Sequence, residues 1–283
     1  MALAPLARVM TEPLVRAALL EDLGRAGDVT TEAIIPAGLQ GRAILVARDR
    51  GVVAGIDLAK LAFELIDPSI CFEVKRGDGS EVEAGDVIAS LSGPARGILT
   101  AERTALNFLG HLSGIASAAA SLVAAVKGTK AKIVCTRKTT PGLRAVEKYA
   151  VRAGGGANHR FGLDDAILIK DNHVAAAGSV SEALRRARAA AGHLVKIEVE
   201  VDSLVQLEEA LAERPDAVLL DNMSLDDLAA AVAMTGGRAI TEASGRVTLH
   251  SAPAVAAAGV DLISAGWLTH SAPVFDIGLD FEG

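Results

Sequence analysis

Residues 133–173 concentrate basic side chains in a protein whose formal net charge is -7. The basic residues of this stretch include Arg137, Lys138, Arg144, Arg152, His159, Arg160 and Lys170. Charge clusters are usually solvated surface. Here the charged residues follow short apolar runs at residues 133–136 and 166–169, and such runs are typical of strands. The glycines at 154–156 would also let the backbone approach a ligand closely. Cations that converge at strand ends are how an α/β protein binds an anion.

A second set of polar residues follows the later predicted strands. Its members are Glu200, Asp221-Asn222, Ser244-Gly245 and Ala265-Gly266. The carboxylates suit a hard cation such as Mg²⁺, which prefers oxygen ligands and shares them with phosphates. The last two turns fall where barrels commonly bind phosphate with backbone N–H groups and a helix N-terminus. The residues therefore predict two bound anions, one held by arginine and lysine and one phosphorylated, with magnesium as cofactor.

Some of these residues have simpler interpretations. Glu198 and Glu200 alternate with apolar residues and so face one side, where a buried structural pair with Lys196 is an alternative. Lys170 could be a Schiff-base lysine, but the adjoining charged residues favour anion binding. The pair Asp164-Asp165 precedes a strand instead of following one, and is interpreted as part of a turn. Four histidines without a predicted ligand cluster are expected to be structural: His111, His193, His250 and His270.

The first part of the chain reads as an α+β region. Helices are predicted at residues 4–24 and 56–66, and short strands within 41–55 and 71–102. Residues 27–36 are expected to form a turn and an extended segment. This region is predicted to be a domain of residues 1–110, to which the tail 269–283 returns as a strand.

The remainder, residues 111–268, alternates between strand and helix. Strands are predicted at 132–136, 166–169, 195–201, 217–220, 238–242 and 260–264. Helices are predicted at 181–191, 203–213, 224–234 and 252–258, with Ser181, Ser203 and Ser224 as N-caps of the first three. This alternation predicts a (β/α) barrel, an incomplete one at this number of units, with an open doubly wound sheet as the alternative.

Composition excludes several classes of protein. With 51% hydrophobic and 22% charged residues the chain is globular. One Trp, one Tyr and a negative net charge argue against nucleic acid as a partner. Cys71 and Cys135 have no metal-ligand or CxxC spacing, so free thiols in a reducing, cytoplasmic compartment are expected.

No membrane association is expected either. Charged residues interrupt the N-terminal apolar run, which argues against a signal peptide. Residues 104–126 carry no Asp, Glu, Lys or Arg and are long enough to span a bilayer. Their serines, glycines, asparagine and histidine favour two buried helical pieces instead.

Several motifs form a long and specific set: TRKTTPGLR at 136–144, GGGANHRFGLDDAILIKDNH at 154–173, and the later IEVEV, LLDN, EASG and SAGWLTHSAP. Together they resemble quinolinate phosphoribosyltransferase, the decarboxylating nicotinate-nucleotide pyrophosphorylase of NAD synthesis. The resemblance runs from GDVTT near the start of the chain to LTHSAP near its end. It implies transfer of phosphoribosyl from phosphoribosyl pyrophosphate to quinolinate, giving nicotinate mononucleotide, pyrophosphate and CO2.

The resemblance also implies roles for individual residues. Four would be catalytic: Lys138, Lys170, Glu200 and Asp221. Arg137, His159, Arg160 and Lys170 would surround the two carboxylates of quinolinate. Glu200 and Asp221 would face the ribose and magnesium, and either lysine could stabilise the charge left by decarboxylation. The other substrate contacts would come from Thr136, Asp171, His173, Ser244, Gly245, Arg246, Ala265, Gly266 and Trp267. Arg103 would enter the active site of a neighbouring subunit, which implies a homodimer or a larger assembly such as a hexamer.

Two other functions stay open from the sequence. A related barrel associated with molybdenum transport shares this scaffold, although different residues at Arg137, His159 and Arg160 would favour it. A non-catalytic anion-binding protein is the other alternative. Such a protein has no need for acids, cations and phosphate turns at successive strand ends.

Overall fold

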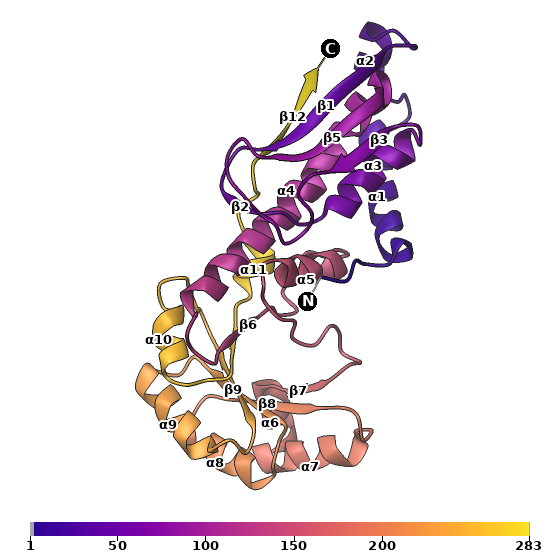
Figure 1. The fold of residues 1–283 in the computed structure, drawn as a ribbon. Helices are drawn as coiled ribbons and strands as arrows, with labels where there is room; N and C mark the ends of the chain where they lie inside the picture. The colour runs from indigo at the N-terminus through magenta and orange to yellow at the C-terminus, as the bar shows by residue number, and fades with distance from the viewer. Residues whose placement is uncertain (1–2, 283) are drawn as a thin grey trace. The chain divides into compact units, whose positions relative to one another are not determined.

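The computed structural model describes residues 3–282, and the chain forms two compact units (Figure 1). The first unit takes residues up to 120, residues 139–155 and the tail from 268 onward. The second unit takes residues 121–138 and 156–267. The chain therefore leaves the second unit after its first strand and returns to it at Gly156.

Three helices of the first unit precede its long helix in the chain. Helix α1 (Arg8–Leu23) ends at Gly24, and α3 covers Ile56–Ile66, so both predicted helices are confirmed. Helix α2 (Val29–Ile34) corrects the turn and extended segment expected there. Its cause is Asp28, whose carboxylate accepts the N–H of Thr31 at 2.9 Å and so caps the helix.

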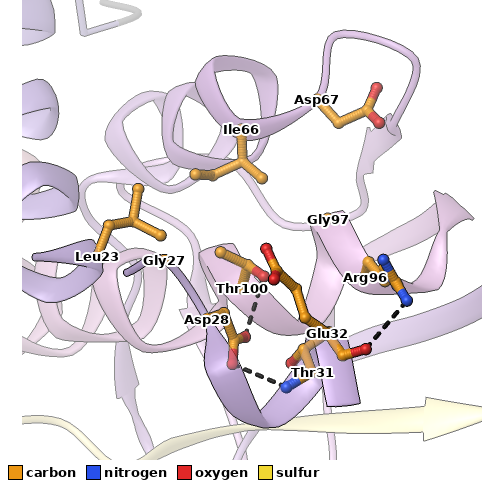
Figure 2. Close-up of a pocket in the computed structure, with 10 residues that line it drawn as sticks. All are labelled: Leu23, Gly27, Asp28, Thr31, Glu32, Ile66, Asp67, Arg96, Gly97 and Thr100. Atoms are coloured by element: carbon orange, nitrogen blue, oxygen red, sulfur yellow. Dashed lines mark hydrogen bonds between the residues drawn. The ribbon is translucent and has the colours of Figure 1, made fainter. Parts of the chain in front are cut away.

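The GDVTT motif borders a cavity of about 310 Å³ in the first unit, shown in Figure 2. Asp28 also accepts the hydroxyl of Thr100 at 3.0 Å, and Arg96 donates to the carbonyl oxygens of Glu32 and Ile35. These bonds attach α2 to the helix that carries Thr100. The polar groups of the motif are therefore used in holding the first unit together.

The sheet of the first unit is antiparallel, in the order β12-β1-β5-β3. Its strands are β1 (Gln40–Ala47), β3 (Cys71–Val74), β5 (Val87–Pro94) and β12 (Ile277–Glu282). Strand β2 (Gly51–Val52) pairs with β4 (Glu81–Val82) beside it. The pairing of β12 with β1 confirms that the C-terminal tail returns to the first region, as Figure 1 shows.

Helix α4 runs without a break from Ala95 to Ala125, which corrects the two helical pieces expected there. It is long and apolar enough to cross a membrane, but half of its apolar window is buried inside the protein. The tail lies directly against it: Gly110 accepts the N–H of Phe275 at 3.0 Å, and a Cβ on Gly114 would overlap the carbonyl oxygen of Pro273. These contacts are those of a core helix.

Helix α5 (Arg144–Ala153) was not predicted, and it belongs to the first unit. At its end, a Cβ on Gly154 would overlap the carbonyl oxygen of Ala116 and lie 2.8 Å from Cβ of Ala119. The glycine is therefore needed where α5 meets α4. This corrects the interpretation of the first glycine of the triplet as a point of close approach to a ligand.

The second unit contains a parallel sheet of six strands in the order β6-β11-β10-β9-β8-β7. They are β6 (Lys132–Val134), β7 (Ile167–Ile169), β8 (Ile197–Val201), β9 (Ala217–Asp221), β10 (Ile240–Ser244) and β11 (Leu262–Ser264). All six predicted strands are confirmed. From β7 to β11 each strand pairs with the next strand in the chain, and β11 pairs in turn with β6. The strand order therefore has none of the reversals of a doubly wound sheet. With β6 and β7 as its two edges, the sheet is an incomplete barrel.

The helices of this unit alternate with the strands. They are α6 (Asp171–Ala177), α7 (Val180–Ala190), α8 (Leu204–Ala212), α9 (Leu225–Thr235), α10 (Ala252–Ala257) and α11 (Trp267–His270), the last one ending in the first unit. Ser203 and Ser224 are confirmed as N-caps. The predicted cap at Ser181 is wrong, because the hydroxyl of Ser179 accepts the N–H of Glu182 at 3.1 Å.

Candidate active site

Parallel pairing brings the predicted polar residues to one edge of the second unit. Ser244 pairs with Asp221, and Glu200 pairs with Leu219 one position before the end of β8. Lys170 directly follows β7, whose Ile169 pairs with Val199. Because the strands are parallel, their carboxyl ends meet at the same edge of the sheet. A cation, two acids and a small turn from four different strands are therefore neighbours.

Glu200 and Asp221 line one cavity of about 300 Å³, together with Asp171, Asp202 and Gln206. Nζ of Lys170 lies 3.2 Å from Oε2 of Glu200, so cation and acid meet at this cavity. A cavity with several carboxylates that also has room for a ligand fits a hard divalent cation and the phosphates that share it.

The alternative pairing of the interior glutamates with Lys196 is wrong. Nζ of Lys196 lies 2.6 Å from Oδ1 of Asp216 and is exposed. Glu198 instead pairs with His159: Nε2 of His159 lies 2.9 Å from Oε2 of Glu198. The two glutamates thus face the inside, as their alternation indicates, and each has a basic partner from another segment of the chain.

Both ring nitrogens of His159 are engaged within the chain. Nδ1 accepts the backbone N–H of Arg160 at 2.7 Å, which leaves the hydrogen on Nε2 for donation to Glu198. The ring is therefore fixed as one neutral tautomer. Direct contact between His159 and a quinolinate carboxylate would require one of these partners to be exchanged.

Glu242 is a buried acid that the sequence analysis missed. It lies on β10, 1% exposed, with Oε2 3.6 Å from Nε2 of His159. Burial, followed by repulsion from Glu198, raises the pKa of Glu242 to about 7, while His159 and Ser264 act in the opposite direction. A lone acid in an apolar strand, two positions before the predicted phosphate turn, was the available signal, since both residues face the same side.

His159, Glu198 and Glu242 also offer ligand atoms within 4.8 Å of one another, the spacing of a metal site. The geometry already has a simpler account. His159 donates to Glu198, and a proton on Glu242 removes the repulsion between the two carboxyl groups. We therefore interpret the cluster as a hydrogen-bonded support beneath the strand-end site.

Arg160 is only partly satisfied by contacts within the described chain. Its Nη1 donates to the carbonyl oxygen of Ala166 at 2.9 Å, while its Nε is buried without a hydrogen-bond acceptor among residues 3–282. Burial and then repulsion from Arg137 lower the pKa of Arg160. A buried donor without an acceptor next to a second guanidinium is best satisfied by a bound anion.

The turn interpretation of Asp164-Asp165 is confirmed for the second residue. The carboxylate of Asp165 accepts the N–H groups of Phe161 at 2.5 Å and Gly162 at 2.9 Å. This turn follows Arg160 and fixes the approach to β7. Asp165 is thus used locally.

Three further predicted residues organise the backbone around the cations. Oγ1 of Thr136 accepts the N–H of Lys138 at 3.0 Å directly after β6. At the start of α6, Nδ1 of His173 accepts the N–H of Lys170 at 2.9 Å, and Asp171 accepts the N–H of Asn172 at 2.7 Å. The unpredicted helix α6 therefore fixes Lys170 at the end of β7.

The predicted phosphate turn has an unusual backbone. Gly245 and Arg246 are consecutive residues with positive φ, 104° and 48°, a conformation that glycine adopts without strain. The indole N–H of Trp267 donates to the carbonyl oxygen of Val247 at 2.9 Å and so braces the same turn. At the neighbouring predicted turn, the N–H of Ala265 donates to the carbonyl oxygen of Val134 at 3.1 Å.

Arg103 differs from the other predicted site residues because it belongs to the first unit. It lies exposed on α4, beside Glu102.

His111 lies about two turns further along α4. Its Nε2 is 2.9 Å from Oε1 of the fully buried Glu147, which agrees with a structural role for this histidine.

Comparison with known proteins agrees with this arrangement. The family models for the N-terminal and C-terminal domains of quinolinate phosphoribosyl transferase match residues 28–113 and 115–280. Nicotinate-nucleotide pyrophosphorylase [carboxylating] of Mycobacterium leprae is 50% identical over 94% of this chain and 95% of its own. The probable enzyme of the same name from Bacillus subtilis is 47% identical, over 92% and 90%. The solved nicotinate-nucleotide pyrophosphorylase of Francisella tularensis superposes with a TM-score of 0.93 at 36% identity, over 100% of this chain and 99% of its own. With both domains matched over nearly its whole length, the chain belongs to the quinolinate phosphoribosyl transferase family.

Proposed function

We propose that this protein is a decarboxylating phosphoribosyltransferase of NAD biosynthesis. It transfers the phosphoribosyl group of phosphoribosyl pyrophosphate to quinolinate and releases nicotinate mononucleotide, pyrophosphate and CO2. The observation that carries the proposal is the guanidinium pair of Arg137 and Arg160. Repulsion between them is relieved by a small dianion, and quinolinate has two adjacent carboxylates.

The second substrate fits the opposite part of the strand-end edge. The left-handed turn at Gly245 and Arg246 suits the 5-phosphate, and the acids Glu200 and Asp221 suit the ribose. The cavity that these acids line has the oxygen ligands that magnesium prefers, so the two carboxylates would hold it. Magnesium would supply charge neutralisation for the departing pyrophosphate.

The bond changes follow from this placement. The bond between ribose C1 and the pyrophosphate oxygen breaks, and Glu200 and Asp221 stabilise the positive charge that develops on the ribose. The pyridine nitrogen then forms the new bond to C1 and becomes cationic. The bond to the 2-carboxylate breaks next, leaving its electron pair on the ring carbon as an ylide, which takes up a proton. Lys138 and Lys170 are the two cations available to stabilise that pair.

The proposal includes the oligomeric state of the protein and its cellular compartment. Arg103 is exposed on α4, where it is available to the site of a second copy, and α1 exposes large apolar side chains at Val9 and Leu20 that a partner would cover. A homodimer, alone or within a hexamer, uses both features. Cys71 and Cys135 are reduced cysteines outside any disulfide, which suits a reducing cytoplasm.

The two other functions have less support. The curated relatives of this chain are named pyrophosphorylases, which does not favour the barrel associated with molybdenum transport. A non-catalytic anion-binding protein would not need the acids Glu200 and Asp221 beside the predicted phosphate turn, because carboxylates repel anions.

The assay combines the protein with quinolinate, phosphoribosyl pyrophosphate and magnesium, and follows nicotinate mononucleotide. Nicotinate replaces quinolinate in the control. It lacks the 2-carboxylate and leaves buried cations unpaired, so its kcat/KM should be lower by about 10⁴-fold. Arg160→Ala should lose most activity with quinolinate, whereas Arg186→Ala on the exposed surface of α7 should not. Comparable turnover of the two acids would remove the basis of the proposal.

A further inference from the structure

Asn222 occupies a strained backbone position between two parts of the strand-end site. It follows β9 directly and has φ of 53°, one of three non-glycine residues with positive φ among the described residues. Side chains rarely adopt this conformation, although asparagine tolerates it better than most. A non-glycine residue in this region at a candidate active site points to a constraint from its neighbours.

Three contacts supply that constraint. The backbone N–H of Asn222 donates to the carbonyl oxygen of Ser244 at 3.0 Å, at the end of β10. The side-chain Nδ2 donates to Oδ2 of Asp221 at 2.6 Å. A Cβ on Gly245 would overlap Oδ1 of Asn222 and lie 2.7 Å from its Cγ. One side chain therefore touches the acid on one side and the phosphate turn on the other.

The three contacts depend on one backbone conformation. The left-handed backbone turns the chain so that the N–H reaches the neighbouring strand instead of solvent. That turn leaves the amide group between Asp221 and Gly245, and the amide donates one hydrogen to the carboxylate. A charge-assisted bond of this kind limits the rotation of the carboxylate. Gly245, with φ of 104°, is the residue that leaves space for the amide.

We propose that Asn222 is a positioning residue that fixes the Asp221 carboxylate relative to the phosphate-binding turn at Ser244–Arg246. It acts through its neighbours and needs no substrate contact of its own. The inference rests on the proposed function, because it assigns the two neighbours to the ribose and to the 5-phosphate of one substrate. It deepens that function by naming the residue that sets the distance between these two groups.

Three substitutions separate the amide from the backbone. Asn222→Gly keeps the positive φ at little cost and removes the amide. Asn222→Asp keeps the shape but places a second carboxylate beside Asp221. Arg214→Gly is the matched control, since Arg214 has the same φ of 53° and lies exposed after α8, outside the site.

The kinetic expectation is specific to one substrate. Loss of a hydrogen bond to a charged group should lower kcat/KM for phosphoribosyl pyrophosphate by about tenfold or more in Asn222→Gly. Asn222→Asp should lose more, because like charges repel. The KM for quinolinate should stay within about twofold in both, and Arg214→Gly should match the wild type. Near-wild-type values for both Asn222 variants, or equal losses for both substrates, would overturn the proposal.

A second measurement does not depend on catalysis. Binding of ribose 5-phosphate, without metal, is measured by calorimetry for Gly245→Ala alone and in the Asn222→Gly background. If the amide is what the new Cβ meets, the double variant should recover part of the affinity lost in Gly245→Ala. Additive losses would contradict the contact. A wild type that binds ribose 5-phosphate but makes no nicotinate mononucleotide would instead reject the proposed function and leave the positioning role standing.

Discussion

Nε2 of His159 lies 2.9 Å from Oε2 of Glu198, and this contact connects the substrate edge of the second unit to its buried interior. The other ring nitrogen accepts the N–H of Arg160, so the pair fixes the backbone that carries a predicted quinolinate-binding arginine. The histidine therefore acts on Arg160 even before any ligand is bound.

The first prediction concerns this contact. Glu198→Ala should raise the KM for quinolinate by about tenfold, because it removes the main acceptor of a partly buried imidazole N–H and loosens Arg160. Glu198→Gln keeps an acceptor oxygen and should have a much smaller effect. Steady-state kinetics with each substrate varied separately make the measurement. If the KM for phosphoribosyl pyrophosphate rose as much as the KM for quinolinate, the effect would not be a specific link to Arg160.

Glu242 should give the protein a distinctive pH dependence. Its pKa is raised from 4.5 to about 7 in the folded state, mainly by burial. The folded protein therefore keeps this proton where the unfolded chain has lost it. The resulting stabilisation is complete below about pH 4.5, falls as pH rises, and is gone above about pH 7.

Glu242→Gln should remove this dependence. The free energy of unfolding of the variant, minus that of the wild type, should increase from pH 5 to pH 8 as measured by urea denaturation. Glu208→Gln, at an exposed position on α8, should give a constant difference. A constant difference for Glu242→Gln as well would mean that the carboxyl group ionises normally.

Gly154 should be required for packing between helices of the first unit. Gly154→Ala places a methyl group onto the carbonyl oxygen of the buried Ala116, and backbone cannot move away as a flexible side chain would. We expect a loss of stability of about 1–3 kcal/mol or more, measured by denaturant unfolding. Gly192→Ala is the control, because nothing lies within 4 Å of its added Cβ. Equal stabilities of the two variants would show that α5 can shift away from α4.

The order of strands and their polar ends could be predicted because both are local in the sequence. The alternation of Glu198 and Glu200 with valine and isoleucine marks β8, and charged residues end each apolar run. Neither α5 nor the use of Gly154 could be predicted this way, because both depend on contacts with α4, which is far away in the chain. Glu242 was missed for a related reason, since its partners are His159, between α5 and β7, and Glu198 on β8.

The acids of the cavity should act through magnesium and the ribose instead of through folding. Glu200→Gln and Asp221→Asn should keep the melting temperature within a few degrees and lose most activity, because each removes a charge that stabilises the developing ribosyl cation. Glu208→Gln provides the control, as Glu208 is exposed on α8 and does not line this cavity. Near-wild-type turnover of either variant at saturating magnesium would contradict the assignment.

The last prediction concerns Arg103, which is exposed on α4 while the other predicted site residues belong to the second unit. If it completes the site of a partner, a two-fold dimer holds two such shared sites. Arg103→Ala should then be folded, dimeric and nearly inactive, and Lys138→Ala should be inactive for a different reason. After subunit exchange, half of the chains are in mixed dimers, and each mixed dimer has one site with both residues intact. Activity should therefore recover to roughly a quarter of the wild-type value, by the symmetry of the interface. Light scattering and labelled subunits verify dimerisation and exchange, and no recovery after verified exchange would mean that Arg103 does not act in its partner's site.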